Sequence, residues 1–249
     1  MRIVTNQPLI DKNKRNATIL FFFSIGVLIV GFFVANGQLF GLAALEELDP
    51  SAYLIIMPLV LLVGFISTLF SVRMTNLWIR QPRPEQAIEE GLKGISNKAA
   101  LYNYYHFPAR HVLVAPQGIF PIITRFQDGR FSVNNDKWRT RRSFLNSIFA
   151  AFRLDGIGDP MGEARDAAAY LRYITEDYDP DINIQPLIVF VDPRAEVEIG
   201  EVSVPVLYVD SKKKPNLKDY LRDYRQEHGD QFSNQEIEDF LAEFERATL

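Results

Sequence analysis

Two long runs of uncharged, mostly apolar residues dominate the first third of the chain. Ala17–Ala35 contains nineteen residues without a charge, and Ala52–Val72 contains twenty-one. As helices rising about 1.5 Å per residue, the runs would span roughly 28–32 Å, which matches the hydrocarbon core of a bilayer. A buried helix of a soluble protein or a cleaved signal peptide fits less well, because the two runs lie only sixteen residues apart. The pattern therefore predicts a two-helix transmembrane hairpin over residues 17–72.

Small residues recur on one face of each predicted membrane helix. They are Ser24 and Gly31 in the first run, and Gly64, Ser67 and Ser71 in the second. Small side chains let helix backbones approach closely within a bilayer, so we expect these faces to pack against each other or against another membrane subunit. Neither run contains an ionisable side chain, which disfavours a transporter or channel subunit.

The charges around the two runs predict their orientation. The flanking segments are basic, through Lys12, Lys14, Arg15, Arg73, Arg80 and Arg83. The connecting segment, residues 36–51, has no Lys or Arg and carries three carboxylates. Because positive charge stays on the cytoplasmic side, we expect both termini and everything after the hairpin in the cytoplasm. The expected location is the inner or plasma membrane of a prokaryote.

Short apolar runs bounded by turn residues follow the hairpin. His111–Ala115 and Ile119–Thr124 flank a Pro-Gln-Gly turn, and an Asp128–Gly129 pair precedes Phe131–Val133. This spacing predicts three consecutive antiparallel strands. The nearly continuous apolar run Pro186–Val191 predicts a central strand that is buried on both faces.

Helical periodicity predicts most of the remaining elements. The apolar spacing in Pro84–Tyr105 predicts a helix, and Asp159–Pro160 is a typical N-cap and first position of another. The other predicted elements are the helix Met161–Glu176, the strand Val202–Val209 and the helices Leu217–Arg225 and Asn234–Arg246. Together they predict an α/β (or α+β) domain with one mixed sheet flanked by helices.

Charge is distributed unevenly between the N-terminal hairpin segment and the rest of the chain. Residues 1–83 carry seven Lys and Arg against four Asp and Glu, a net charge of +3, so the total of −4 leaves −7 for residues 84–249. Such an acidic domain is a poor general binder of nucleic acid, because phosphate contacts need local positive charge. Cysteine is absent, which excludes disulfides and thiolate metal ligands.

The prolines at 82 and 84 would break a helix just past the membrane, so we place the domain boundary there. The expected organisation is a cytoplasmic segment, the hairpin, a basic linker, a cytoplasmic domain and an acidic C-terminal helix, over residues 1–16, 17–72, 73–84, 85–225 and 226–249.

Four sequence blocks carry a family resemblance. They are HVLVAPQGIFPIITRFQDGRFSVNNDKWR, DPMGEARDAAAYLRYI, PLIVFVDPRAEVEI and VPVLYVDSKKKPNLKDYLRD. In this order they resemble the nuclease-related domain (NERD) family over roughly residues 85–225. The resemblance implies a PD-(D/E)xK-nuclease-like fold with an αβββαβ core, and it is also consistent with short transmembrane segments beside the domain.

The positions that the resemblance assigns to catalysis hold unsuitable residues. Arg110 stands before His111, where typical members have an Asp. Ile123 and Arg125 stand where those members have the Glu and Lys of a Glu-x-Lys motif. A glutamate on the first helix often completes the family's site. The remaining candidates for parts of the site are Glu85, Glu89 and His111.

The chemistry shows why these changes matter. Nucleases of this kind hold Mg²⁺ on convergent carboxylates, and the metal activates water and stabilises the charge of the transition state. An isoleucine at 123 cannot bind a metal, and an arginine at 110 would repel one. An arginine at 125 stays protonated because of its high pKa, so it cannot act as a base. We therefore expect no catalytic residues and no cofactor. Mg²⁺ belongs only to the alternative, an active nuclease with relocated ligands such as Glu89, Asp128 and Asp136.

One basic cluster stands out in the acidic domain. Its residues are Lys137, Trp138, Arg139, Arg141 and Arg142. It could bind nucleic-acid backbone, anionic lipid headgroups or an acidic partner, or it could be a solvated loop. No metal site is indicated by the three histidines, since none has an i+4 histidine partner.

These observations lead to one functional hypothesis. A membrane-anchored, non-catalytic, nuclease-related domain would act as a binding or scaffold protein, or as an accessory subunit of a membrane complex. Its expected partners are the lipid bilayer and either a membrane protein or a second copy of the chain. Nucleic acid is a less favoured partner.

Overall fold

The computed structural model describes residues 1–41, 50–141, 156–178 and 181–246. These residues form two compact units. Pro8–Gln81 form a helical hairpin, whereas Met1–Gln7 belong with the residues from Pro82 onward in an α/β unit. The α/β unit is therefore built from sequence on both sides of the hairpin.

The hairpin consists of two 29-residue helices. Helix α1 covers Gln7–Ala35 and α3 covers Pro50–Trp78, with a 3₁₀ turn, η1 (Gly37–Phe40), after α1. Both helices are long and apolar enough to cross a membrane. Their large apolar side chains face outward, with Phe22 65% exposed and Leu54 75% exposed. A core helix of a soluble protein would bury such side chains, whereas a bilayer would cover them.

The two helices meet along a line of small residues. The buried residues of α1 recur at every seventh position, at Ile10, Ala17, Ser24 and Gly31. A Cβ added at Gly31 would lie 2.9 Å from Val60 Cγ1 of α3. One added at Gly64 of α3 would lie 3.2 Å from Leu28 Cδ2 of α1. Glycine at these positions allows the close approach of the two backbones.

Serines lie on the same faces and satisfy their hydroxyl groups within their own helices. Ser24 and Ser67 are buried, and so is Ser71. Ser24 Oγ donates to the Leu20 carbonyl at 2.9 Å, and Ser67 Oγ donates to the Gly64 carbonyl at 3.0 Å. Such back-bonding removes the need for a polar partner inside an apolar environment.

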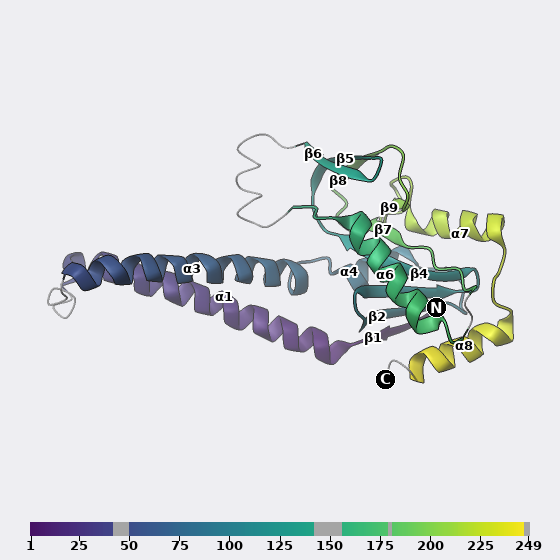
Figure 1. The fold of residues 1–249 in the computed structure, drawn as a ribbon, viewed down its shortest axis with the longest axis horizontal. Coiled ribbons are helices and arrows are strands. Elements are labelled where there is room, and N and C mark those ends of the chain that lie inside the picture. The colour runs from purple at the N-terminus through teal and green to yellow at the C-terminus, as the bar shows by residue number, and fades with distance from the viewer. Residues whose placement is uncertain (42–49, 142–155, 179–180, 247–249) are drawn as a thin grey trace. The chain divides into compact units, whose positions relative to one another are not determined.

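The α/β unit is organised on a six-stranded mixed sheet (Figure 1). Its spatial order is β1, β2, β3, β4, β7 and β9. The strands are β1 (Arg2–Thr5), β2 (Ala100–His106), β3 (Ala109–Ala115), β4 (Gly118–Arg125), β7 (Leu187–Phe190) and β9 (Val206–Tyr208). The strands β2, β3 and β4 are antiparallel, while β1 runs parallel to β2, and β7 and β9 continue parallel to β4.

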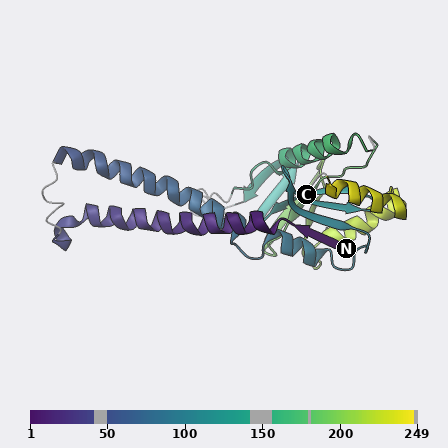
Figure 2. The same cartoon turned by 90° about the horizontal axis from the view of Figure 1, so that it is seen from below.

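Helices cover both faces of this sheet, as the turned view shows (Figure 2). Helix α6 (Pro160–Thr175) and α8 (Asn234–Arg246) contribute to the buried cluster on one face, through residues such as Met161 and Phe240. Helix α4 (Pro84–Gly91) and α7 (Leu217–His228) contribute to the cluster on the other face, through residues such as Ile88 and Leu221. The strand β7 is buried at all four positions, as predicted for a central strand.

A second, three-stranded sheet carries the basic cluster. It consists of β6 (Lys137–Arg141), β5 (Gly129–Asn134) and β8 (Ala195–Ile199), in that order. The hairpin of β5 and β6 closes through Asn135 and Asp136, whose φ values are 48° and 61°. Two consecutive positive φ values are typical of the type I′ turn, which suits a two-residue hairpin.

The predicted meander of three antiparallel strands is correct only for its first pair. The turn at Pro116–Gln117 joins β3 to β4 as expected, with Ala115 paired to Gly118. The next strand, β5, instead leaves the large sheet and pairs with β6 and β8. The reason is that the parallel strand β7 occupies the free edge of β4, with Ile122–Arg125 paired to Leu187–Phe190. The expectation of a single mixed sheet was therefore wrong.

The predicted helix Pro84–Tyr105 is also wrong in its second half. Helix α4 ends at Gly91, and residues 100–106 form β2. A Cβ at Gly91 would lie 2.6 Å from Val209 Cγ2, so glycine is needed there for close packing. Gly94 follows with φ +78°, which ends the helical path. The aromatic residues after it favour a strand.

The order of elements contains a helix, three strands, a helix and a strand. These are α4, β2, β3, β4, α6 and β7, with β5 and β6 inserted between β4 and α6. The strand Val202–Val209 is shorter than predicted and begins only after Pro205. The strands β1, β2, β6 and β8 have no counterpart among the predicted strands.

Candidate functional site

Arg125, the last residue of β4, is the centre of a buried polar site in the α/β unit. Its side chain is buried, yet it carries a guanidinium group. Arg125 Nε donates to the Ile157 carbonyl at 3.0 Å, and Nη1 donates to the Thr124 carbonyl at 3.0 Å. Glu163 of α6 supplies the counter-charge, with its two oxygens 3.1 Å from Nη1 and 2.9 Å from Nη2. Only the contact from Nη1 has hydrogen-bond geometry, and the contact of Nη2 is an ion pair without it.

Arg125 is a charged group whose nearest counter-charge is Glu163. Burial lowers the pKa of Arg125, the carboxylate of Glu163 raises it, and the nearby positive charge of Arg110 lowers it again. Arginine stays protonated in proteins, so the group cannot accept a proton from water. Arg125 is therefore a fixed cation held by protein groups.

The other two positions of the expected site flank Arg125 on the same end of the sheet. The register pairs His111 with Ile122, which brings Arg110 to the level of Ile123 on the neighbouring strand. Arg110 is exposed. Ile123 is 6% exposed and belongs to the same buried cluster as Met161 and Ala164 of α6. Position 123, where the resemblance leads us to expect a metal-binding carboxylate in an active member, thus contributes to core packing.

The start of α6 adds two carboxylates near this site, and both are engaged. Asp159 is the N-cap, as predicted, and its Oδ1 accepts from the Gly162 amide at 3.0 Å. Pro160 occupies the first helical position. Glu163 pairs with Arg125. Within the described ranges, no three His, Asp or Glu side chains come together in a way that could hold a metal ion.

Asp128, Asp136 and Glu89, the metal ligands of the alternative hypothesis, do not share contacts with one another. Asp128 pairs with Arg194 at 3.1 Å. Asp136, in the β5–β6 turn, accepts from the amide of Ser203 at 2.8 Å and from its hydroxyl at 2.6 Å. These bonds lower the pKa of Asp136. Glu89 is exposed on α4. These three carboxylates therefore do not converge on one metal-binding position among the described residues.

Two other candidate remnants, Glu85 and His111, belong to a buried polar network. Tyr104 donates its hydroxyl to Glu85 Oε2 at 2.9 Å, and Arg83 Nε lies 2.8 Å from Glu85 Oε1. Tyr104 has φ +67°, an uncommon value for a bulky residue. Its ring contacts the His111 ring edge-on, with centroids 5.0 Å apart.

The network continues to the N-terminal strand. His111 Nδ1 lies 2.8 Å from Asn103 Oδ1, and Asn103 Nδ2 donates to Thr5 Oγ1 at 3.0 Å. Burial, and secondarily the charge of Arg110, lower the pKa of His111 to about 3, so it is neutral at physiological pH. The network thus attaches β1 and the start of α4 to the same irregular part of β2. A register shift between Asn103 and His106 marks that part.

Sequence reasoning missed the residues that hold this network together. The sequence pattern contains no signal for the left-handed conformation of Tyr104. Asn103, the one amide in an aromatic run of five residues, was the available hint. A buried amide needs partners, so its presence in an apolar strand predicts a polar network.

The basic cluster lies on a strand rather than in a loop. Lys137 and Arg139 are exposed and alternate with Trp138 along β6. Trp138 is half-buried, with its ring 5.9 Å from that of Phe190 in the large sheet. Its indole nitrogen is buried and makes no hydrogen bond with any residue that the structure describes. Arg142 lies outside the described residues.

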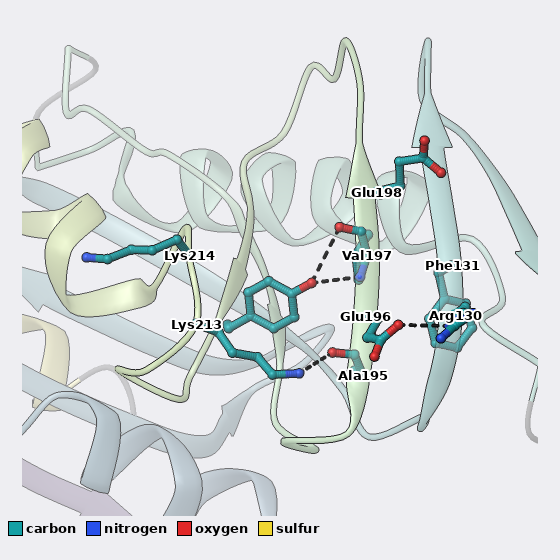
Figure 3. A pocket seen from close by; sticks show the side chains of 9 residues that line it. Arg130, Phe131, Ala195, Glu196, Val197, Glu198, Lys213 and Lys214 are labelled. Atoms are coloured by element: carbon teal, nitrogen blue, oxygen red, sulfur yellow. Dashed lines mark hydrogen bonds and ion pairs between the residues drawn. The ribbon is translucent and has the colours of Figure 1, made fainter.

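A cavity of about 500 Å³ lies along the open edge of β8 (Figure 3). Side chains satisfy the backbone of that edge. Tyr208 Oη accepts from the Val197 amide at 2.7 Å, and Lys213 Nζ donates to the Ala195 carbonyl at 2.5 Å. Arg130 and Glu196 pair at 2.9 Å on the adjacent strands. The cavity therefore has a protected strand edge, and the charged side chains that line it are engaged by other described residues.

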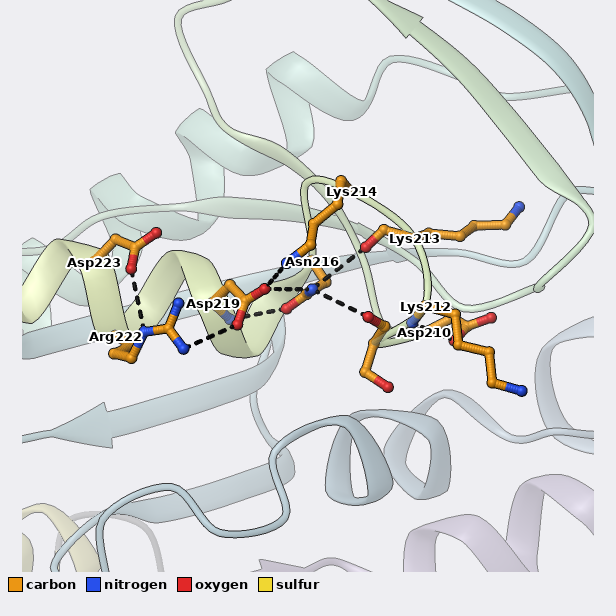
Figure 4. A network of polar contacts seen from close by, with 9 residues as sticks. Asp210, Lys212, Lys213, Lys214, Asn216, Asp219, Arg222 and Asp223 are labelled. Carbon is orange, nitrogen blue, oxygen red and sulfur yellow. Dashed lines mark hydrogen bonds and ion pairs between the residues drawn. The ribbon is translucent and has the colours of Figure 1, made fainter.

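The lysine-rich turn before α7 is part of a helix cap (Figure 4). Asn216 Oδ1 accepts from the Asp219 amide at 2.8 Å, and Asn216 Nδ2 donates to Asp219 Oδ2 at 2.8 Å. Lys214 also pairs with Asp219, and Arg222 lies 3.3 Å from it. The neighbouring Lys212 binds Asp210 through its backbone amide. These contacts give the turn a structural role.

No family model, curated protein or solved structure matches this chain. Its function must be inferred from the arrangement of its residues.

Proposed function

We propose that this protein is a membrane-anchored member of the nuclease-related domain family whose cytoplasmic domain binds a partner and does not cut nucleic acid. The order of α4, β2, β3, β4, α6 and β7 supports the family resemblance, because it has the helix-and-strand sequence of the αβββαβ core. The sequence blocks that carry the resemblance supply β3, β4, α6 and β7 of this core.

The pair of Arg125 and Glu163 carries the proposal for a lost reaction. A metal-dependent nuclease needs convergent carboxylates that are free to bind the ion. Here Glu163 binds the guanidinium of Arg125 with both oxygens, while Ile123 fills the core beside it. A divalent cation at this place would meet a fixed positive charge and no free carboxylate.

The two apolar helices support a membrane anchor. Their outward-facing apolar side chains would lie against lipid, and their facing small residues would pair the helices within the bilayer. The basic flanks and the acidic connecting segment favour an orientation with both termini in the cytoplasm. An anchored domain without a reaction of its own is suited to scaffolding or to an accessory role in a membrane complex.

A cleavage assay tests the proposed loss of activity. The full chain, purified in mild detergent, would be incubated with single- and double-stranded DNA and RNA in Mg²⁺ or Mn²⁺. We expect no metal-dependent cleavage, because the described residues offer no convergent carboxylate set. Cleavage that is lost in Asp128→Ala or Asp136→Ala would contradict the proposal and establish the alternative, a membrane-bound nuclease with relocated ligands.

A further inference from the structure

Within the described part of the α/β unit, β6 carries basic residues at alternate positions. Lys137, Arg139 and Arg141 stand at every second position of the strand, so their Cα atoms are about 7 Å apart along one face. We call these three residues the basic row. Lys137 and Arg139 are exposed, and neither forms a hydrogen bond or ion pair with another described residue.

The strand next to the basic row, β5, places no carboxylate opposite it. The register places Asn134, Ser132 and Arg130 of β5 opposite Lys137, Arg139 and Arg141. Arg130 is paired with Glu196 of β8. Glu196 and Glu198 share the face of the row but lie on β8, two strands and about 10 Å from β6. Lys137 and Arg139 therefore present their positive charge outward.

The remainder of the domain restricts what this row can bind. Residues 84–249 carry a net charge of −7, which repels nucleic acid and anionic membranes alike at long range. A polyanion in solution would have to be captured against this repulsion. An anionic surface that is already held close needs only a local basic contact, since electrostatic attraction acts within a Debye length of about 8–10 Å.

The length of the connecting chain favours the membrane over a soluble polyanion. Helix α3 ends at Trp78 and α4 begins at Pro84. The residues between them extend at most about 18 Å, and the helical residues past the predicted span at Val72 add about 9 Å. The anchor would therefore keep the domain at a high effective concentration near the leaflet.

We propose that the basic row docks the cytoplasmic domain onto the headgroups of anionic lipids in the adjacent leaflet. The contact is electrostatic, without insertion of an aromatic side chain, because Trp138 points inward against Phe190. Docking should therefore depend on the lipid charge and weaken with salt. This inference rests on the membrane anchor of the proposed function.

The absence of cysteine allows a direct measurement. A single Thr140→Cys substitution places a fluorescent donor at an exposed position of β6, between Arg139 and Arg141. The labelled full chain would be reconstituted into vesicles of phosphatidylcholine alone or with 30% phosphatidylglycerol, which also carry an acceptor-labelled lipid. We expect energy transfer to increase with the anionic lipid and to return toward its initial value in 0.5 M salt.

Charge variants assign that change to the basic row. In Lys137→Gln/Arg139→Gln/Arg141→Gln, the increase should disappear, with the ratio of docked to undocked domain falling about fivefold for each charge removed, which corresponds to about 1 kcal/mol each. The control Lys98→Gln/Arg172→Gln/Lys212→Gln removes three exposed charges elsewhere and should keep the increase. Arg139→Lys/Arg141→Lys should also keep it, because the row acts through charge.

The experiment distinguishes failure of the membrane anchor from failure of lipid docking. A chain that fails to float with vesicles after alkaline washing would refute the membrane anchor itself. A chain that floats, but whose energy transfer is independent of lipid charge or unchanged in the triple variant, would refute docking alone. Binding of a labelled oligonucleotide that the triple variant loses, without any lipid response, would assign the row to nucleic acid instead.

Discussion

At the scale of single residues, the partner of Arg125 determines the chemistry at the end of β4. The sequence shows directly that Arg110, Ile123 and Arg125 stand where the resemblance would place an acid, an acid and a lysine. It does not predict that Glu163 binds the guanidinium, since this residue lies 38 positions later on a separate helix. The packing of α6 against β4 brings Glu163 to Arg125, and this contact could not be predicted from either segment alone.

Removing the carboxylate should destabilise the α/β unit. We expect Glu163→Ala to lower the free energy of unfolding by about 1–2 kcal/mol, because the buried guanidinium loses its counter-charge. The effect stays modest because the Glu163 side chain is 55% exposed, so water can replace part of the contact. The measurement is denaturant unfolding in detergent, followed by Trp138 fluorescence in a Trp78→Phe background.

Two comparisons separate this effect from a general effect on the helix. Glu163→Gln keeps an acceptor and should lose less stability than Glu163→Ala. Asp166→Ala, at an exposed position of the same helix, should change it little. Equal stability of Glu163→Ala and the unsubstituted chain would mean that Arg125 needs no partner.

The buried histidines predict a pH dependence of stability. Burial lowers the pKa of His106 to about 4, and burial with the charge of Arg110 lowers that of His111 to about 3. An unfolded histidine titrates near 6.5. Between about pH 6.5 and pH 4 the unfolded chain therefore binds protons that the folded chain does not, and stability falls as the pH falls.

Replacing one of these histidines should reduce that slope. His106→Phe retains an aromatic ring against Phe244, whose centroid is 4.3 Å from that of the histidine. We expect the loss of stability between pH 6 and pH 4.5 to become smaller by up to about 1.4 kcal/mol per pH unit. Unfolding curves at several pH values test this, with the exposed His228→Gln as the control. An unchanged slope in His106→Phe would show that His106 is protonated in the folded chain.

At the scale of elements, the periodic segments were predictable and the exchange of strands between sheets was not. β3, β4, β7, α6, α7 and α8 follow from hydrophobic spacing and turn residues. The helix expected up to Tyr105 failed because Gly91 must pack against Val209, a contact across more than a hundred residues. The departure of β5 from the large sheet depends on the competing strand β7. Such non-local competition is invisible to local pattern.

The irregular part of β2 should be important for joining its neighbouring elements. Tyr104→Phe removes the hydroxyl that binds Glu85, a carboxylate that is 5% exposed. We expect a loss of about 1–3 kcal/mol in stability, the usual cost of an unsatisfied buried polar group. Tyr105→Phe alters the adjacent, half-buried tyrosine and should be nearly neutral. A comparable loss in both variants would mean that the hydroxyl of Tyr104 adds nothing specific.

At the scale of the whole molecule, two units with different surfaces share one chain. The hairpin exposes large apolar side chains, and the α/β unit combines an acidic total charge with one basic row. Both ends of the hairpin sequence continue into the α/β unit, through β1 and through α4. The run lengths predicted the two apolar helices, whereas no signal in the sequence indicated that Met1–Gln7 belong to the α/β unit. The partner that the anchored domain would serve is not encoded in any local motif.

The proposed role is tested most directly by the subunit composition of the assembly that contains this protein after extraction from its native membrane in mild detergent. The purified assembly would be analysed by size-exclusion chromatography with light scattering and by native mass spectrometry. For a scaffold or accessory subunit, we predict a fixed stoichiometric assembly with a membrane protein or a second copy of the chain. A single chain without a partner, together with metal-dependent cleavage of nucleic acid, would contradict the proposed role.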